Sequence, residues 1–71
     1  PERAVAARDA TARALAALPD DQRVTVVLVD GEGFDNQTAA QILGVAPGTI
    51  GSRLSRARTT LRRSLGEEDR S

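Results

Sequence analysis

Hydrophobic side chains recur at intervals of three and four residues along most of this chain, which is the spacing of one face of an α-helix. The pattern predicts four helices, at about residues 3–17, 19–30, 36–43 and 47–65, followed by an acidic frayed tail at 66–71. Pro19 separates the first two helices, because it stops one and can occupy the first position of the next. Asp20 and Asp21 then fall in the first turn, where carboxylates interact favourably with the helix dipole.

Residues 23–30 are the ambiguous part of this pattern. They are rich in β-branched side chains, and Val24, Val26 and Leu28 alternate as they would in a strand. The same segment also offers Val24, Val27 and Leu28 at helical spacing. Since the sequence has no second strand-like segment with which a strand could pair, we predict a helix here and an all-α fold.

The helix predicted at 36–43 has a signal at each end. Asp35 is placed to cap its N-terminus, and Gly44 is placed to end it. Phe34 is the only aromatic residue of the chain, and we expect it to anchor the core by packing back on Ala39.

The helix predicted at 47–65 has two contrasting faces. With about 100° per residue, one narrow arc is apolar and consists of Ile50, Leu54, Ala57, Leu61 and Leu65. The opposite arc is small, hydroxylated and cationic and consists of Gly48, Ser52, Ser55, Arg56, Thr59 and Arg63, with Arg53 and Arg58 on its flanks. We expect the first arc to face the core and the second to face solvent.

Composition restricts both the size of the domain and its chemistry. A chain of 71 residues with sixteen large apolar side chains is enough for one small domain, most easily built from helices. The sequence has no cysteine and no histidine, so we expect no enzyme, metal site or cofactor. It has no apolar run long enough to cross a bilayer, which predicts a cytoplasmic protein without a membrane partner. Because it begins without methionine, we expect residues 1–71 to be one domain excised from a longer chain.

The formal net charge of zero hides a strong separation of charge along the chain. Residues 1–46 carry −3, residues 47–65 carry five arginines and no acid, and residues 66–71 carry −2. One interpretation is a solvated helix whose arginines pair with acids on neighbouring helices. The other is a basic surface for nucleic acid on the last helix.

The order of elements supports the nucleic-acid interpretation. A short helix, a tight turn containing Gly44 and a longer helix with an exposed basic face form the layout of a helix-turn-helix. In that layout the second helix enters the major groove, and arginines along its sides contact phosphates. Gly48 and Ser52 would allow close approach, and Arg56 is long enough to reach guanine O6 and N7.

Several motifs resemble region 4, the C-terminal promoter-binding domain, of bacterial extracytoplasmic-function (ECF) sigma factors. They are Leu18-Pro19-Asp20-Asp21-Gln22-Arg23-Val24, then Gly33-Phe34, Ala40-Gln41-Ile42-Leu43-Gly44-Val45 and Gly48-Thr49-Ile50-Gly51-Ser52-Arg53-Leu54-Ser55-Arg56-Ala57-Arg58. The resemblance runs from about Ala14 to Leu65. It implies a small four-helix, winged-helix-like domain of the sigma region 4 type.

The resemblance also implies a function and partners. Such a domain recognises the −35 promoter element while docked on RNA polymerase core through the β-subunit flap, and an anti-sigma factor commonly covers it. Carried over to this chain, the DNA-binding residues would be Thr49 near a phosphate and Ser52, Arg53, Ser55 and Arg56 in the groove, with Thr59 and Arg63 on the same face. Arg58 lies nearer the apolar arc, so an ion pair within the domain is an open alternative for it.

This sequence departs from the family pattern at three positions. Gly51 stands where a basic residue is usual, Thr38 stands where a glutamate is usual, and Ala46 stands where a hydroxyl N-cap is frequent. Two other functions remain to be weighed: a helix-turn-helix from a dimeric activator of the response-regulator type, and a helical module whose arginine face binds an acidic protein.

Overall fold

Over residues 2–70, the domain consists of four α-helices and one π-helical turn. The computed structural model describes the backbone of residues 2–70 and the side chains of residues 8–66. Its elements are α1 (Glu2–Ala16), α2 (Asp20–Val26), the π-helical turn η1 (Val27–Gly31), α3 (Asn36–Leu43) and α4 (Pro47–Arg70). Over residues 2–70 there is no strand, and the predicted all-α fold is confirmed.

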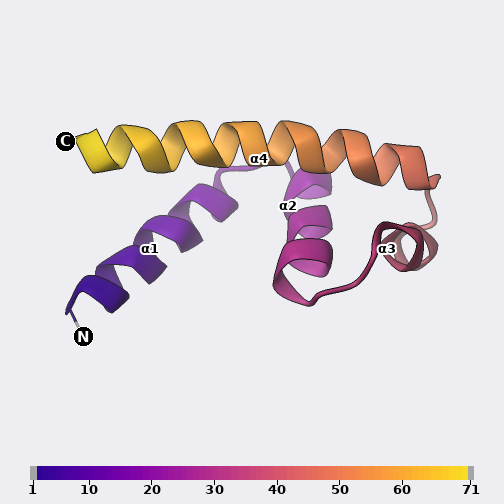
Figure 1. Ribbon diagram of the computed structural model, residues 1–71, viewed down its shortest axis with the longest axis horizontal. Helices are drawn as coiled ribbons and strands as arrows, with labels where there is room; N and C mark the ends of the chain where they lie inside the picture. Colours follow the sequence, from indigo (N-terminus) through magenta and orange to yellow (C-terminus); the bar gives the residue numbers. More distant parts are fainter. Residues whose placement is uncertain (1, 71) are drawn as a thin grey trace.

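The long helix α4 is the element on which the others pack. It runs along the longest dimension of a domain of 38 × 22 × 16 Å, with α1 beneath its C-terminal part, α2 at its middle and α3 beneath its N-terminal end (Figure 1). The core lies under α4 and consists of Leu18, Val26, Ala39, Ala40, Ile50, Leu54 and Ala57. The predicted apolar arc is therefore confirmed: its first three members are buried, and Leu61 packs against the core half-buried.

The C-terminal boundary of α4 was predicted wrongly. The helix was expected to end at residue 65, and the following residues were expected to fray, but α4 continues through Gly66 to Arg70. A glycine inside a helix costs only about 1 kcal/mol relative to alanine, so one glycine does not end a helix whose next residues favour helix. The first helix also begins and ends one residue earlier than predicted.

The segment from residue 23 to residue 30 is helical, as predicted, but its buried face differs from the expected one. Val24 and Val27 are each 40% exposed, whereas Thr25 and Val26 are buried. The hydroxyl of Thr25 donates a hydrogen bond to the carbonyl of Asp21 at 2.7 Å, which satisfies this polar group in the core. Because the polar residue Thr25 lies on the buried face, the spacing of the apolar residues alone predicted the wrong face of this helix.

The π-helical turn η1 follows directly, and no sequence signal predicted it. Its wide turn is closed by a hydrogen bond of 2.8 Å from the amide of Glu32 to the carbonyl of Val27, five residues earlier. Leu28 and Val29 of this turn pack partly buried against the core. The turn thereby completes the contact of this segment with the rest of the domain and presents Asp30 at its exposed end.

Both ends of α3 have the predicted caps, whereas Phe34, the residue before the N-cap, is not buried as predicted. The carboxylate of Asp35 accepts a hydrogen bond from the amide of Thr38 at 2.7 Å, and this contact lowers the pKa of Asp35 below its usual value. Gly44 adopts a left-handed conformation with φ of 69°, which a side chain would disfavour.

Phe34 is 39% exposed and lies outside the core cluster, so its predicted role as a core anchor is wrong. The buried alanines Ala39 and Ala40 fill that part of the core instead.

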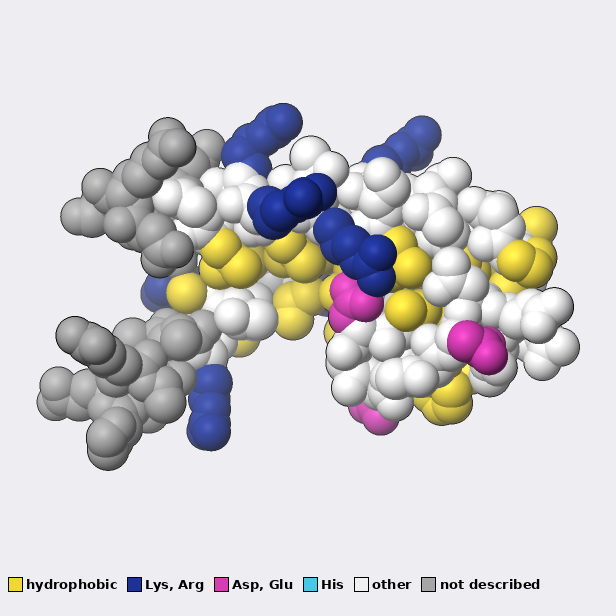
Figure 2. All heavy atoms as spheres, in the orientation of Figure 1, with side chains coloured by type: hydrophobic (Ala, Val, Ile, Leu, Met, Phe, Trp, Pro, Cys, Tyr) yellow, Lys and Arg dark blue, Asp and Glu magenta, His cyan; other side chains and the backbone are white. Residues whose placement is uncertain are grey.

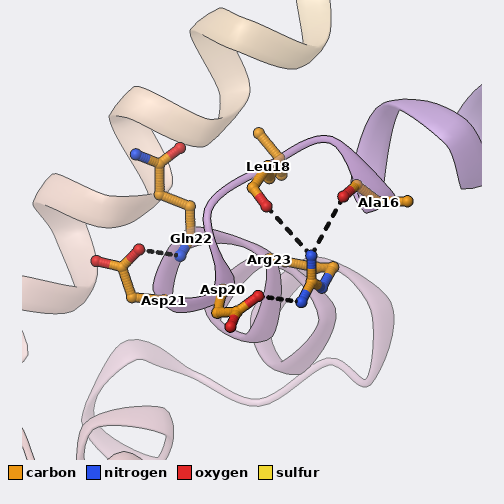
Figure 3. A network of polar contacts seen from close by, with 6 residues as sticks. All are labelled: Ala16, Leu18, Asp20, Asp21, Gln22 and Arg23. Atoms are coloured by element: carbon orange, nitrogen blue, oxygen red, sulfur yellow. Dashed lines mark hydrogen bonds and ion pairs between the residues drawn. The ribbon is translucent and has the colours of Figure 1, made fainter.

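Arg23 joins the end of α1 to the start of α2 (Figure 3). Its guanidinium donates hydrogen bonds to the carbonyls of Ala16 at 3.3 Å and Leu18 at 3.1 Å, and it forms an ion pair with Asp20. A cation at the C-terminal end of α1 also complements the helix dipole there. Pro19 occupies the N-cap position of α2, one residue earlier than predicted.

The start of α4 lacks a side-chain cap, which leads to a stability prediction. The carbonyl of Ala46 accepts hydrogen bonds from the amides of Thr49 and Ile50, so Ala46 stands at the N-cap position without a side-chain acceptor. We expect Ala46→Ser to raise the free energy of unfolding by about 1 kcal/mol, measured by urea denaturation. Ala12→Ser on the exposed side of α1 is the control and should not stabilise the domain. Equal effects of the two substitutions would contradict the N-cap assignment.

Candidate nucleic-acid interface

Helices α3 and α4 form a helix-turn-helix. The turn between them is Gly44-Val45-Ala46, and it is closed by a hydrogen bond of 3.0 Å from the amide of Val45 to the carbonyl of Ala40. The two helices pack against each other, with Ile50 of α4 and Ala39 of α3 both fully buried. This packing fixes the direction in which the opposite face of α4 points, and that face is directed at solvent.

The predicted DNA-binding residues lie mainly on this exposed face. Ser52, Ser55, Arg56, Thr59 and Arg63 are exposed, while Thr49 in the first turn is half-buried. Figure 2 shows several basic side chains along α4 and others below it at the lower left, whereas the acidic side chains visible from this side all lie below α4. The predicted arrangement of the face is observed, and the DNA contacts of its residues stay a prediction.

The exposed face has few internal contacts that would compete with a ligand. The hydroxyl of Thr59 donates to the carbonyl of Ser55 at 2.9 Å and keeps its lone pairs available as acceptors. Within the described part of the chain, Arg56 and Arg63 have no carboxylate partner. The Nε atom of Arg62 donates to the carbonyl of Arg58 at 3.4 Å, and its guanidinium is otherwise free of described partners. Three arginines of α4 between residues 47 and 65 therefore have no acidic partner among the side chains that the structure describes.

Arg53 occupies a different position from the other predicted site residues. Its Nε atom lies 3.7 Å from a carboxylate oxygen of Asp21 in the first turn of α2, and its side chain is only 24% exposed. Arg53 is thus held at the flank of α4 that faces α2. A contact between Arg53 and DNA would require the guanidinium to reach around this flank.

Arg58 forms a two-point ion pair with Asp30 of η1. Its Nε and Nη2 atoms donate hydrogen bonds to the two carboxylate oxygens, at 3.1 Å and 2.7 Å. These hydrogen bonds lower the pKa of Asp30 below its usual value and raise the pKa of Arg58, while burial opposes both shifts. The ion pair within the domain that was an alternative for Arg58 is therefore observed in this structure.

Sequence reasoning did not identify Asp21 and Asp30 as partners of the α4 arginines. Asp30 and Arg58 are separated by 28 residues, so no local pattern connects them. The only available signal was the opposite charge of the two segments, which predicts attraction without identifying pairs. Both interpretations of the charge separation are thus partly realised: of the five arginines at residues 47–65, two pair with acids and three have no acidic partner among the described residues.

The residues that the structure describes form neither a metal-binding cluster nor a membrane-spanning helix. Among the described residues, no group of three or more acidic side chains comes together in a way that could hold a metal ion. Between residues 2 and 70, no helix is both long and apolar enough to cross a bilayer.

Comparison with known proteins identifies a family. The sequence profile of the family described as Sigma-70, region 4 matches residues 8–61. No solved structure gives a significant match.

Three curated relatives are similar to this chain over most of its length. The ECF RNA polymerase sigma factor SigM of Mycobacterium tuberculosis is 51% identical over 57 residues, which are 80% of this chain and 29% of the relative. The ECF RNA polymerase sigma factor EcfG of Rhodopseudomonas palustris is 49% identical over 59 residues, 79% of this chain and 33% of the relative. The probable RNA polymerase sigma factor RfaY of Xanthomonas campestris is 41% identical over 51 residues, 72% of this chain and 13% of the relative. The chain therefore spans a third or less of the length of these relatives.

Proposed function

The chain belongs to the sigma-70 region 4 family, and from this premise we propose that it recognises the −35 promoter element as the DNA-binding part of an RNA polymerase sigma factor. The family match spans α2, η1, α3 and residues 47–61 of α4, and so includes the turn of the helix-turn-helix and the predicted DNA-binding residues from Thr49 to Thr59. This supports the sigma-factor interpretation over the dimeric activator and over the module that binds an acidic protein.

The observation that carries the proposal is the exposed face of α4. Helix-turn-helix proteins place the N-terminal part of the second helix in the major groove, and here that part carries small and hydroxylated side chains followed by Arg56. We assign Ser52, Ser55 and Arg56 to base edges, because hydroxyls and guanidinium groups supply the donors that read them. Thr49 and Arg63 are assigned to phosphates, where they would fix the register of the domain on the duplex.

Thr59 and Arg53 complete the proposed set of contacts. Thr59 lies on the exposed face between Arg56 and Arg63 and offers its hydroxyl oxygen as an acceptor. Arg53 would act at the edge of the groove, since its pairing with Asp21 restrains it at the flank of α4. Its contribution to DNA binding is therefore expected to be smaller than that of Arg56.

The proposed partners beyond DNA are RNA polymerase core, engaged through the β-subunit flap, and an anti-sigma factor. The names of the relatives support the first, since two are named as RNA polymerase sigma factors and the third as a probable one. A shallow hollow at the flank of α4 exposes Leu61 and Leu65 beside the polar side chains of Asp30, Arg58 and Arg62, and this partly apolar surface is a candidate for contact with a protein. The zero net charge supports the same view, because it predicts modest affinity of the isolated domain for DNA and hence a need for polymerase.

Selection from randomised duplexes tests the proposal directly. The 71-residue chain is expected to enrich one short, non-palindromic sequence at low salt and to lose affinity steeply as salt rises. Enrichment of a palindrome by a dimer of the chain would favour the activator-type interpretation. Absence of salt-dependent binding to any duplex would refute DNA recognition by this surface.

A further inference from the structure

Two acids on one side of the domain hold two of the five arginines that α4 carries within residues 47–65. Asp21 lies at the beginning of α2 and pairs with Arg53, and Asp30 lies in η1 and pairs with Arg58. Since α2 packs on α4, the two pairs flank this helix contact. The arginines of α4 therefore divide into a restrained group and a group without acidic partners among the described residues.

The pair between Asp30 and Arg58 is the stronger of the two. Both carboxylate oxygens of Asp30 accept a hydrogen bond, whereas Asp21 has a single oxygen at 3.7 Å from Arg53. Two parallel hydrogen bonds between a guanidinium and a carboxylate fix the orientation of both groups. The side chains of Arg58 and Asp30 are 49% and 43% exposed, so the pair is accessible to solvent and to a ligand. Its effect on folding stability is expected to be small for that reason.

Arg58 would reach the DNA side of α4 if it were released. Arg62 lies one helical turn further along and donates to the carbonyl of Arg58, so the two side chains leave the same side of α4. That side borders the exposed face that carries Ser55 and Thr59. Two adjacent guanidinium groups at this border could bind phosphates of one strand.

We propose that Asp30 limits the sequence-independent affinity of this domain for DNA by holding Arg58 away from the phosphates. The proposal rests on the DNA binding proposed above. An arginine that moves from a carboxylate to a phosphate exchanges one charge-assisted pair for another, so the exchange gains little affinity. It also releases fewer counterions than an arginine that starts unpaired, since its charge was already neutralised. Arg58 thus adds little to binding while Asp30 is present.

This restraint would lower the affinity of the domain for every sequence by the same factor, while discrimination between sequences stays with the base contacts. Phosphate contacts strengthen binding to every sequence, whereas base contacts distinguish the promoter from the rest of the genome. Withholding one phosphate contact lowers the background affinity and leaves the proposed base contacts of Arg56 intact.

The decisive comparison is Asp30→Asn against Glu32→Gln. Each substitution removes one negative charge at nearly the same place, but Glu32 has no ion-pair partner among the described residues. Binding of the 71-residue chain to a labelled duplex of mixed sequence is measured over a four-fold range of salt. We expect Asp30→Asn to bind more tightly at low salt than Glu32→Gln and to lose about 3.5-fold more affinity over that range, as one additional phosphate contact predicts.

Arg58→Ala provides the second test and does not depend on the first variant. We expect this substitution to leave the parental affinity and salt dependence nearly unchanged. In the Arg58→Ala background, Asp30→Asn should have no larger effect than Glu32→Gln. If Asp30→Asn itself unfolds, as judged by loss of helical circular dichroism, Arg58→Ala alone decides.

Two results would overturn the proposal. One is equal binding by Asp30→Asn and Glu32→Gln, and the other is a loss of affinity in Arg58→Ala as large as that in Arg63→Ala. If the parental chain binds DNA in a salt-dependent manner, either result refutes this inference but not the proposed function. A parent that binds no duplex refutes the proposed function and this inference with it.

Discussion

Ile50→Ala is expected to destabilise the domain by about 2–5 kcal/mol, measured as the free energy of unfolding in urea. Ile50 is fully buried in the first turns of α4 and is the largest side chain of its part of the core. A domain of this size has a total stability of about 4–10 kcal/mol, so this single change would remove a large share of it. The alanine-rich surroundings, Ala39 and Ala40, are too short to fill the resulting cavity.

Ile42→Ala provides the matched control for this substitution. Ile42 lies on α3 and is 53% exposed, so the same change in chemistry removes few packed contacts. We expect it to cost less than about 1 kcal/mol, in the range of ordinary surface substitutions. Equal destabilisation by the two variants would show that α4 does not pack on α3 through Ile50.

The same substitution has a consequence for the proposed DNA face. Ile50 lies between Thr49 and Ser52 in sequence, and its burial fixes the rotation of α4 at the end that would enter the groove. A cavity at this position would loosen the orientation of the residues assigned to base edges. The DNA affinity of Ile50→Ala should therefore fall even under conditions in which most molecules are still helical.

Much of this fold could be predicted from the sequence because its signals are local. The arc of Ile50, Leu54 and Ala57 repeats at helical spacing, and the caps Asp35 and Gly44 act on residues within one turn. The predictions that failed depended on tertiary contacts. Phe34 resembled a core residue in its chemistry alone, but it is 39% exposed and lies outside the core cluster to which Ala39 and Ala40 belong.

The candidate site was predictable to a similar extent and for the same reason. Which residues share a face of α4 follows from helical periodicity, and Ser52, Arg56 and Arg63 are exposed as predicted. Which arginines are restrained depends on how η1 and α2 approach α4. Because the π-helical turn has no sequence signature here, the position of Asp30 beside Arg58 could be obtained only from the folded structure.

Arg56→Ala is expected to weaken binding to the preferred duplex by about 1–3 kcal/mol and to relax the choice of base at one position. Arg56 is exposed on the face opposite the core and has no acidic partner among the described residues, so its removal costs no internal contact. The free energy of unfolding should therefore stay close to that of the parent, which separates an effect on recognition from an effect on folding. Affinity is measured for the preferred duplex and for a mixed-sequence duplex at two salt concentrations.

Arg63→Ala is the matched control for Arg56→Ala, since it removes the same side chain from the same exposed face two turns later. A phosphate contact carries no sequence information, so this variant should lose affinity for both duplexes alike and reduce the salt slope by about 0.9. Arg56→Ala should instead lose more affinity for the preferred duplex than for the mixed one. If both variants bind both duplexes as the parent does, this face of α4 does not contact DNA. If Arg56→Ala behaves like Arg63→Ala, Arg56 binds a phosphate, and base recognition depends on the hydroxyl side chains at the start of the helix.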